Sequence, residues 1–246
     1  MSEDGWFMVG SHNKIVKPKT LISDSTPLSK EELVTNKKAP SIGQINRSLE
    51  KKKIVLNDSK FLISTKDQIL VELNKLPEIH YSQIKLICYG IGSIFKSSIS
   101  QFQFILLQFI KEWIEEFSKT TITIELFDPI LSEKEKQFFC DKGCICYDTD
   151  EKCCKIVNPD QFTLFYMPHC EKFMYCNVLT TNGDRLDKIM IIGNSFEHYN
   201  LICFSKKTRK EIRPILSVLG KTIEIPFIIF TEATDVFNNT CLIKFQ

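Results

Sequence analysis

Apolar residues between positions 61 and 246 form short continuous runs that predict strands, separated by stretches with helical periodicity. The runs predict six strands and a final edge strand, at residues 84–89, 121–127, 144–147, 162–167, 188–192, 222–229 and 241–245. Strands that alternate with helices indicate a mostly parallel sheet, and near-continuous apolar strands indicate burial on both faces. We therefore predict a Rossmann-like three-layer α/β/α domain over residues 61–246.

Apolar residues spaced three or four positions apart predict the helices between these strands. The longest helix spans residues 98–117, and its stripe is Phe102, Leu106, Phe109, Trp113 and Phe117. A helix over 65–76 precedes the first strand. Ser132 and Glu135 form a capping box that opens a short helix, which Gly143 closes. Further helices are predicted after His169 and over 208–219.

The first sixty residues lack this periodicity and are rich in Lys, Ser, Thr, Asn and Pro. They hold 11 basic residues (Lys and Arg) against 7 acidic residues (Asp and Glu), so this segment is basic. So few apolar groups cannot offset the entropy lost on ordering the chain. Residues 1–60 are therefore predicted to be a mostly disordered basic tail.

Composition narrows the class of protein. The chain has 43% hydrophobic and 25% charged residues and a formal net charge of +2, which gives no strong signal for nucleic acid. No secretory signal is visible and the longest apolar runs are too short to span a bilayer, so no membrane partner is predicted. With this background, the ten cysteines are interpreted as reduced thiols of a cytoplasmic, and also nuclear, protein.

Four strand ends carry small or polar residues that could contact a ligand. They are Gly90, Gly92 and Ser93 after the first strand, Asp128 after the second, His169 and Glu171 after the fourth, and Asn194 and Ser195 after the fifth. Because parallel strands present their carboxyl ends at one edge, these residues are predicted to share a rim. Ligands bind at that edge in open α/β sheets.

The glycine turn and Asp128 each have two interpretations. Gly90-Ile-Gly92-Ser93 could bring backbone N–H groups close to an anion or a ribose, or it could be a plain tight turn. The third glycine of the dinucleotide fingerprint is replaced by Phe95, and the P-loop lysine is missing. Asp128 could grip a ribose hydroxyl, or Asp-Pro could be turn chemistry.

His169 is the sharpest catalytic candidate, because an imidazole can act as a general base, a proton shuttle or a metal ligand near neutral pH. Glu171 could orient the His169 ring, or both residues could cap the following helix. Asn194 and Ser195 could donate hydrogen bonds to a ligand, or form the N-cap of the next segment. Cys144, Cys146, Cys153 and Cys154 do not have the paired spacing of a structural zinc site, so no metal site is predicted.

Four motifs carry a resemblance to a known family. The segments Leu-Phe-Tyr-Met-Pro-His-Cys-Glu-Lys-Phe at 164–173, Ile-Ile-Gly-Asn-Ser-Phe at 191–196, Gly-Ile-Gly-Ser at 90–93 and Phe-Asp-Pro-Ile at 127–130 resemble the Sensitivity to Red light Reduced (SRR-like) family. The resemblance covers about residues 80–246. It implies a regulatory protein in a circadian clock input pathway and in the regulation of haem biosynthesis, with protein partners and no established reaction.

Two alternatives to a purely regulatory protein come from the rim residues. The first is an enzyme that uses a nucleotide or S-adenosylmethionine, with His169 and Glu171 as the catalytic pair. The second is a haem sensor with His169 or Cys170 as the axial ligand. The sequence leaves the identity of any cofactor or small-molecule ligand open.

Overall fold

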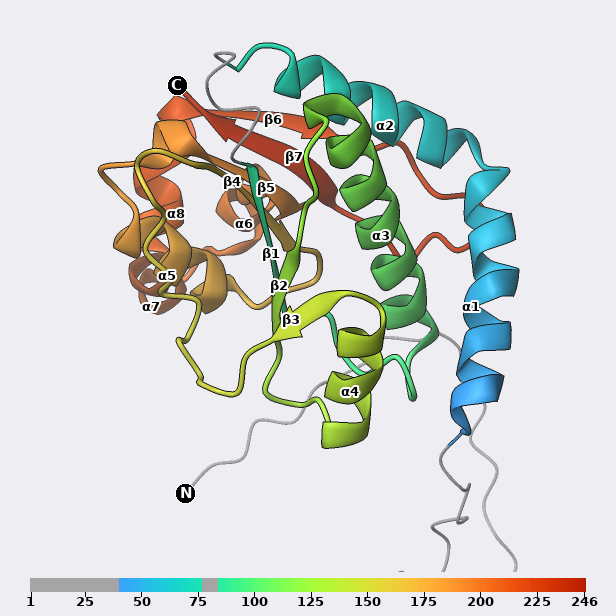
Figure 1. The fold of residues 1–246 in the computed structure, drawn as a ribbon. Coiled ribbons are helices and arrows are strands. Elements are labelled where there is room, and N and C mark those ends of the chain that lie inside the picture. Colours follow the sequence, from blue (N-terminus) through green and yellow to red (C-terminus); the bar gives the residue numbers. More distant parts are fainter. Residues whose placement is uncertain (1–39, 77–83) are drawn as a thin grey trace, which may run out of the picture. The chain divides into compact units, whose positions relative to one another are not determined.

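A computed structural model describes residues 40–76 and 84–246, and these described residues form one compact unit (Figure 1). Its centre is a seven-stranded sheet in the order β3-β2-β1-β4-β5-β7-β6. The strands are β1 (Ile84–Tyr89), β2 (Ile124–Phe127), β3 (Cys144–Cys146), β4 (Phe162–Met167), β5 (Ile189–Asn194), β6 (Thr222–Pro226) and β7 (Thr240–Phe245). The first five strands pair in parallel, and β7 runs antiparallel to both of its neighbours.

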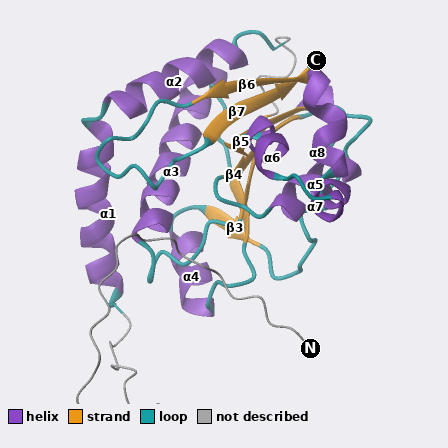
Figure 2. Ribbon diagram, turned by 180° about the vertical axis from the view of Figure 1, so that it is seen from behind, coloured by secondary structure: helices purple, strands orange, loops and turns teal. Residues whose placement is uncertain are grey.

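Helices cover both faces of the sheet, as Figures 1 and 2 show from opposite sides. One hydrophobic core holds residues of α1 (Ile42–Asn57), α2 (Lys60–Leu73), α3 (Ser98–Ser118) and α4 (Glu133–Asp141). The other core holds residues of α5 (Lys172–Thr181), α6 (Phe196–Ile202), α8 (Arg213–Val218) and the loop after β3, and α7 (Lys206–Glu211) precedes α8 without a buried residue of its own. The predicted three-layer α/β/α fold with a mostly parallel sheet is therefore confirmed.

The N-terminal boundary of the folded region differs from the prediction. Residues 42–57, expected in a disordered tail, form α1, and α2 begins at Lys60 instead of residue 65. Helix α1 buries Ile45, Leu49 and Leu56 against the core, and Ser41 and Gln44 form a capping box at its start. The folded region therefore begins about twenty residues earlier than expected. Residues 1–39 of the predicted tail lie outside the described residues.

The C-terminal strand is also placed differently from the prediction. Residues 241–245 were expected at an edge of the sheet, but β7, which contains them, lies between β5 and β6, and β6 is the edge. The helix predicted over 208–219 is divided at Ile212, because Pro214 follows in the first turn of α8 and cannot donate a backbone hydrogen bond. Helix α6 adds a third short helix to this part of the chain.

Parallel pairing brings the carboxyl ends of β1, β2, β4 and β5 to one edge of the sheet. Tyr89 pairs with Phe127, and Met167 pairs with Gly193, so the residues after these strands lie at similar heights. None of the described helices is long and apolar enough to cross a membrane. Ligands of open α/β sheets bind at this carboxyl edge, so the four strand ends are the expected position of a ligand site.

Candidate functional site

A cavity of about 330 Å³ opens at the carboxyl edge of β1, β2 and β4. This volume lies within the range of small-molecule sites. Five of the eight predicted site residues line the cavity: Gly90, Gly92, Asp128, His169 and Glu171. The other three, Ser93, Asn194 and Ser195, lie behind or beside it and bond to the protein itself. Whether the five cavity residues bind a ligand stays a prediction.

His169 lies in the turn between β4 and α5, called the His169 corner below, and is held there by both its backbone and its ring. Its φ is +57°, a left-handed conformation that is uncommon outside glycine. Its backbone N–H donates to Oδ1 of Asn194 at 2.9 Å, and ring Nε2 lies 2.9 Å from the carbonyl oxygen of Val236. Because a carbonyl only accepts, Nε2 must carry the proton, which leaves Nδ1 as the acceptor of a neutral ring.

Tyr175 of α5 ties the ends of β4 and β5 together behind the corner. Its buried hydroxyl donates to the carbonyl of Met167 and accepts from the backbone N–H of Asn194 at 2.9 Å. This approach requires a glycine at position 193, since a Cβ there would lie 2.7 Å from the Tyr175 hydroxyl oxygen. Tyr175 was not predicted as a site residue. Its position one helical turn after Glu171 was the sequence signal that could have revealed it.

The glycine turn after β1 is fixed by Asp128, which is buried. Oδ2 of Asp128 accepts from the N–H of Gly92 at 2.7 Å, and Oδ1 accepts from the N–H of Ile130 at 3.0 Å. The N–H of Gly90 donates to the carbonyl of Phe127 at 3.2 Å. Both glycines have positive φ, +65° at Gly90 and +75° at Gly92. The geometry therefore agrees with the turn interpretation of these residues.

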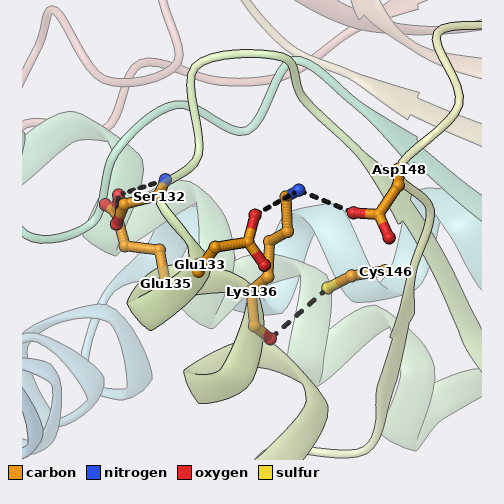
Figure 3. Close-up of polar contacts among 6 residues, drawn as sticks. All are labelled: Ser132, Glu133, Glu135, Lys136, Cys146 and Asp148. Atoms are coloured by element: carbon orange, nitrogen blue, oxygen red, sulfur yellow. Dashed lines mark hydrogen bonds and ion pairs between the residues drawn. The ribbon is translucent and has the colours of Figure 1, made fainter.

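Ser93 faces α4 and not the cavity. Its hydroxyl donates to Oε1 of Glu135. Oε2 of Glu135 accepts from the Ser132 N–H at 3.1 Å and from the Ser132 hydroxyl at 2.8 Å (Figure 3). Burial raises the pKa of Glu135, but the hydrogen bonds from Ser93 and Ser132 outweigh it, so the pKa lies below its ordinary value. The capping box was predicted, whereas the bond to Ser93 carries no local sequence signal.

Neighbouring contacts in Figure 3 hold the start of α4 to the loop after β3. Lys136 lies between Glu133 at 2.8 Å and Asp148 at 2.6 Å, and these bonds raise the pKa of Lys136 above its ordinary value. The thiol of Cys146 donates to the Lys136 carbonyl at 3.6 Å. These contacts join α4 to β3 and the loop after it, and none of the residues that make them lines the cavity.

Ser195 caps α6 instead of facing the cavity. Its hydroxyl accepts from the N–H of His198 at 2.9 Å and donates to Oε2 of Glu224 at 2.6 Å. Glu224 Oε1 also accepts from the N–H of Phe196 at 2.7 Å. The N-cap interpretation of Ser195 is therefore confirmed, and Glu224, which sequence analysis missed, is its partner from the edge strand.

A loop that the sequence did not single out forms another wall of the cavity. Lys152 and Cys153 have φ of +49° and +60°, and the Lys152 carbonyl accepts from Nδ2 of Asn177 at 2.7 Å. Of the eight left-handed residues in the described part of the chain, five line this cavity: Gly90, Gly92, Lys152, Cys153 and His169. Backbone conformations of this kind cluster at ligand sites.

Two buried thiols lie at the cavity. Cys170 Sγ donates to the carbonyl of Tyr89 at 3.2 Å, and burial raises the pKa of this thiol well above its ordinary value. Burial also raises the pKa of Cys153 to about 12. A cysteine binds haem iron as a thiolate, so the buried Cys170, whose pKa is raised, does not fit the role of an axial ligand. His169 would have only Nδ1 to offer to iron.

Comparison with known proteins assigns the chain to a family. A family model described as the SRR1 domain matches residues 72–244. The chain is 35% identical over 160 residues to the Arabidopsis thaliana protein SENSITIVITY TO RED LIGHT REDUCED 1, an alignment that covers 63% of this chain and 55% of that protein. It is 32% identical over 117 residues to a Mus musculus SRR1-like protein, covering 47% and 45% of the two chains.

These alignments span about half the length of the curated relatives. No solved structure matches the chain. The family model, in contrast, covers most of the chain and includes β1 to β5, the glycine turn and the His169 corner. The chain therefore belongs to the SRR1 domain family, as its motifs predicted.

Proposed function

We propose that this chain is a regulatory protein that acts in a circadian clock input pathway and in the regulation of haem biosynthesis, through protein partners. One observation carries the proposal beyond family membership. The polar groups at the rim are bonded within the protein: Asp128 to two backbone N–H groups, His169 to Val236, and Ser195 to Glu224. Groups held by internal hydrogen bonds are less available for proton transfer, which favours a regulatory protein over a catalytic one.

The name of the Arabidopsis thaliana relative, which refers to sensitivity to red light, supports the light-input part of this proposal. The test is expression of the chain in Arabidopsis thaliana plants that lack this relative. We expect the chain to restore the growth response to red light and the period of a clock-driven reporter. Haem content of the same plants reports on the second part. A chain that accumulates normally and restores none of these would overturn the proposal.

A second function is favoured by the cavity, namely an enzyme that uses a nucleotide or S-adenosylmethionine. The cavity brings Gly90, Gly92 and Asp128 beside His169, whose Nδ1 is an acceptor in the neutral ring. The fold by itself assigns no chemistry, so this second function rests on the residues that line the cavity.

Thermal unfolding in the presence of nucleotides, S-adenosylmethionine or haem tests the second function. A ligand that binds the folded state must raise the melting temperature near saturation. For a ligand that is turned over, His169→Asn should abolish turnover and keep the fold, because asparagine tolerates a left-handed backbone. Full activity in this variant would remove His169 from the catalytic role. If none of these ligands raises the melting temperature, the enzyme function loses its support.

A further inference from the structure

We propose that the cavity at the carboxyl edge of β1, β2 and β4 binds a small organic cation that carries a flat ring. Sulfonium nucleosides such as S-adenosylmethionine belong to this chemical class. The inference rests on the cavity being a ligand site, as in the second function above, and adds the charge and shape of the ligand. It is independent of the regulatory role.

Carboxylates outnumber amines in the cavity wall. Asp128, Asp150 and Glu171 line it, whereas Lys152 is the only lysine or arginine among its lining residues. Asp150 and Glu171 are exposed, so their side chains can turn toward a ligand. Asp128 is buried, so its charge acts through a medium that screens less than water does. An anion would face this excess of negative charge, and a cation would be attracted by it.

Three backbone N–H groups near the glycine turn that could hold a phosphate are already bonded within the protein. The N–H of Gly90 donates to Phe127, and the N–H of Gly92 donates to the Asp128 carboxylate at 2.7 Å. At the start of α3, the hydroxyl of Ser97 accepts from the N–H of Ser100 at 3.1 Å. A glycine loop binds phosphate through free N–H groups at a helix start. The bonded glycine N–H groups therefore give this turn less capacity to hold a phosphate than such a loop has.

The remaining wall is apolar and suits a flat ring. Phe127, Phe173 and Met174 line the cavity, and Phe173 keeps 50% of its surface exposed. An aromatic ring left half in solvent can stack on a ligand ring or attract a cation to its face. The backbone of Gly90 also lines the cavity. A side chain at this position is excluded, because its Cβ would lie 2.7 Å from Cys170 Sγ.

A buried hydroxyl without a partner in the described part of the chain belongs to Tyr89, which precedes the cavity residue Gly90. Tyr89 is 2% exposed, and its hydroxyl oxygen has no hydrogen-bond partner in the described chain. Burial raises the pKa of Tyr89, and its ring belongs to the same hydrophobic core as the cavity residues Phe127 and Cys153. A buried polar group of this kind is normally satisfied, so a ligand or water that reaches it would complete its bonding.

Calorimetric titration of the full chain tests the inference with matched probes. S-adenosylmethionine carries a sulfonium charge, S-adenosylhomocysteine is its neutral thioether, and adenosine monophosphate is an anion with the same ring. Phenyltrimethylammonium tests the class without a nucleoside. We expect both cations to bind and S-adenosylmethionine to bind at least about threefold more tightly than the thioether, a difference of the size that one or two partly exposed charge pairs produce.

Two variants separate the cavity from the rest of the surface. Glu171→Gln removes a carboxylate of the wall, and should weaken binding of S-adenosylmethionine about two- to fivefold without changing binding of the thioether. Glu197→Gln, an exposed carboxylate at the start of α6 and outside this cavity, should change neither. Equal effects of the two variants would overturn the assignment to this cavity.

The outcomes distinguish this inference from the function it rests on. If adenosine monophosphate binds as tightly as S-adenosylmethionine, the proposed preference for a cation is wrong. The same holds if S-adenosylmethionine and S-adenosylhomocysteine bind equally. In both cases the cavity remains a ligand site. If none of the four probes binds, the inference and the enzyme function fail together. The regulatory function is decided separately by the plants that lack the relative.

Discussion

The backbone N–H of His169 donates to Oδ1 of Asn194 at 2.9 Å, which joins the residue after β4's Pro168 to the last residue of β5. The same amide donates through Nδ2 to the carbonyl of Cys170 at 3.2 Å and to the hydroxyl of Tyr199 at 2.9 Å. One side chain therefore holds the left-handed corner that carries the specific family motif.

Replacing Asn194 with alanine should destabilise the protein by about 1–2 kcal/mol, because three hydrogen bonds are lost and water can replace part of them at this partly exposed site. The measurement is urea unfolding. Asn200→Ala is the matched control: its bonds to Glu197 and Arg209 are 3.3 Å and 3.4 Å long, and its loss should stay within about 0.5 kcal/mol. Equal stability of the two variants would contradict the role given to Asn194.

Gly193→Ala should cost about 1–3 kcal/mol, the usual range for overpacking a closely packed interior. The added Cβ would meet the Tyr175 hydroxyl at 2.7 Å and break the bridge between β4 and β5. Gly220→Ala is the control, since nothing lies within 4 Å of a Cβ at that exposed position. Thermal unfolding of both variants checks the prediction, and a Gly193→Ala protein as stable as the control would refute it.

Glu135 should make the stability depend on pH below neutrality. Its pKa is lower in the folded protein than its ordinary value of 4.5, so the stabilisation is complete above that value and is lost as the pH falls through the folded pKa. Urea unfolding of Glu135→Gln should show a deficit at pH 7 that shrinks below about pH 4. A deficit that is constant from pH 7 to pH 3 would show that ionisation of Glu135 does not contribute.

Thiol labelling should divide the cysteines into two classes. Cys140 and Cys154 are exposed and should react within the native protein, whereas Cys170 should react only on unfolding, because it is buried with a raised pKa. Labelling with an aromatic disulfide, followed by mass spectrometry, measures this order. The double variant Cys140→Ser, Cys154→Ser is the control and should lose most of the native signal. Rapid native labelling of Cys170 would reopen its use as a ligand for haem.

Much of the sheet could be predicted, because apolar runs bounded by turn residues mark β1 and β4, whose ends agree with the sequence prediction. The position of β7 between β5 and β6 could not be predicted, because the pairing of strands depends on tertiary contacts and not only on the residues of β7 itself. Helix α1 was missed because its many lysines conceal a narrow stripe of Ile45, Leu49 and Leu56. Its Ser41–Gln44 capping box was the signal that could have revealed it.

The location of the rim residues at one edge of the sheet could be predicted, but their hydrogen-bond partners could not. Parallel topology brings Gly92, Asp128 and His169 to one cavity, as the order of strands and helices implied. The partners of Ser93 and Ser195 are Glu135 and Glu224, which lie 42 and 29 residues away and follow from helix and strand packing. The left-handed backbone at Lys152 and Cys153 is imposed by its surroundings, since neither residue type favours it.

The most direct test of the cavity as the functional site is hydrogen–deuterium exchange of the full chain with and without saturating S-adenosylmethionine. We expect slower exchange in segments 89–93, 150–154 and 169–174, each of which contains residues that line the cavity. Segments 195–201 and 224–227, which line a different hollow at the same edge of the sheet, should be unchanged. Protection confined to those two segments, or no protection in any of the five, would contradict this account.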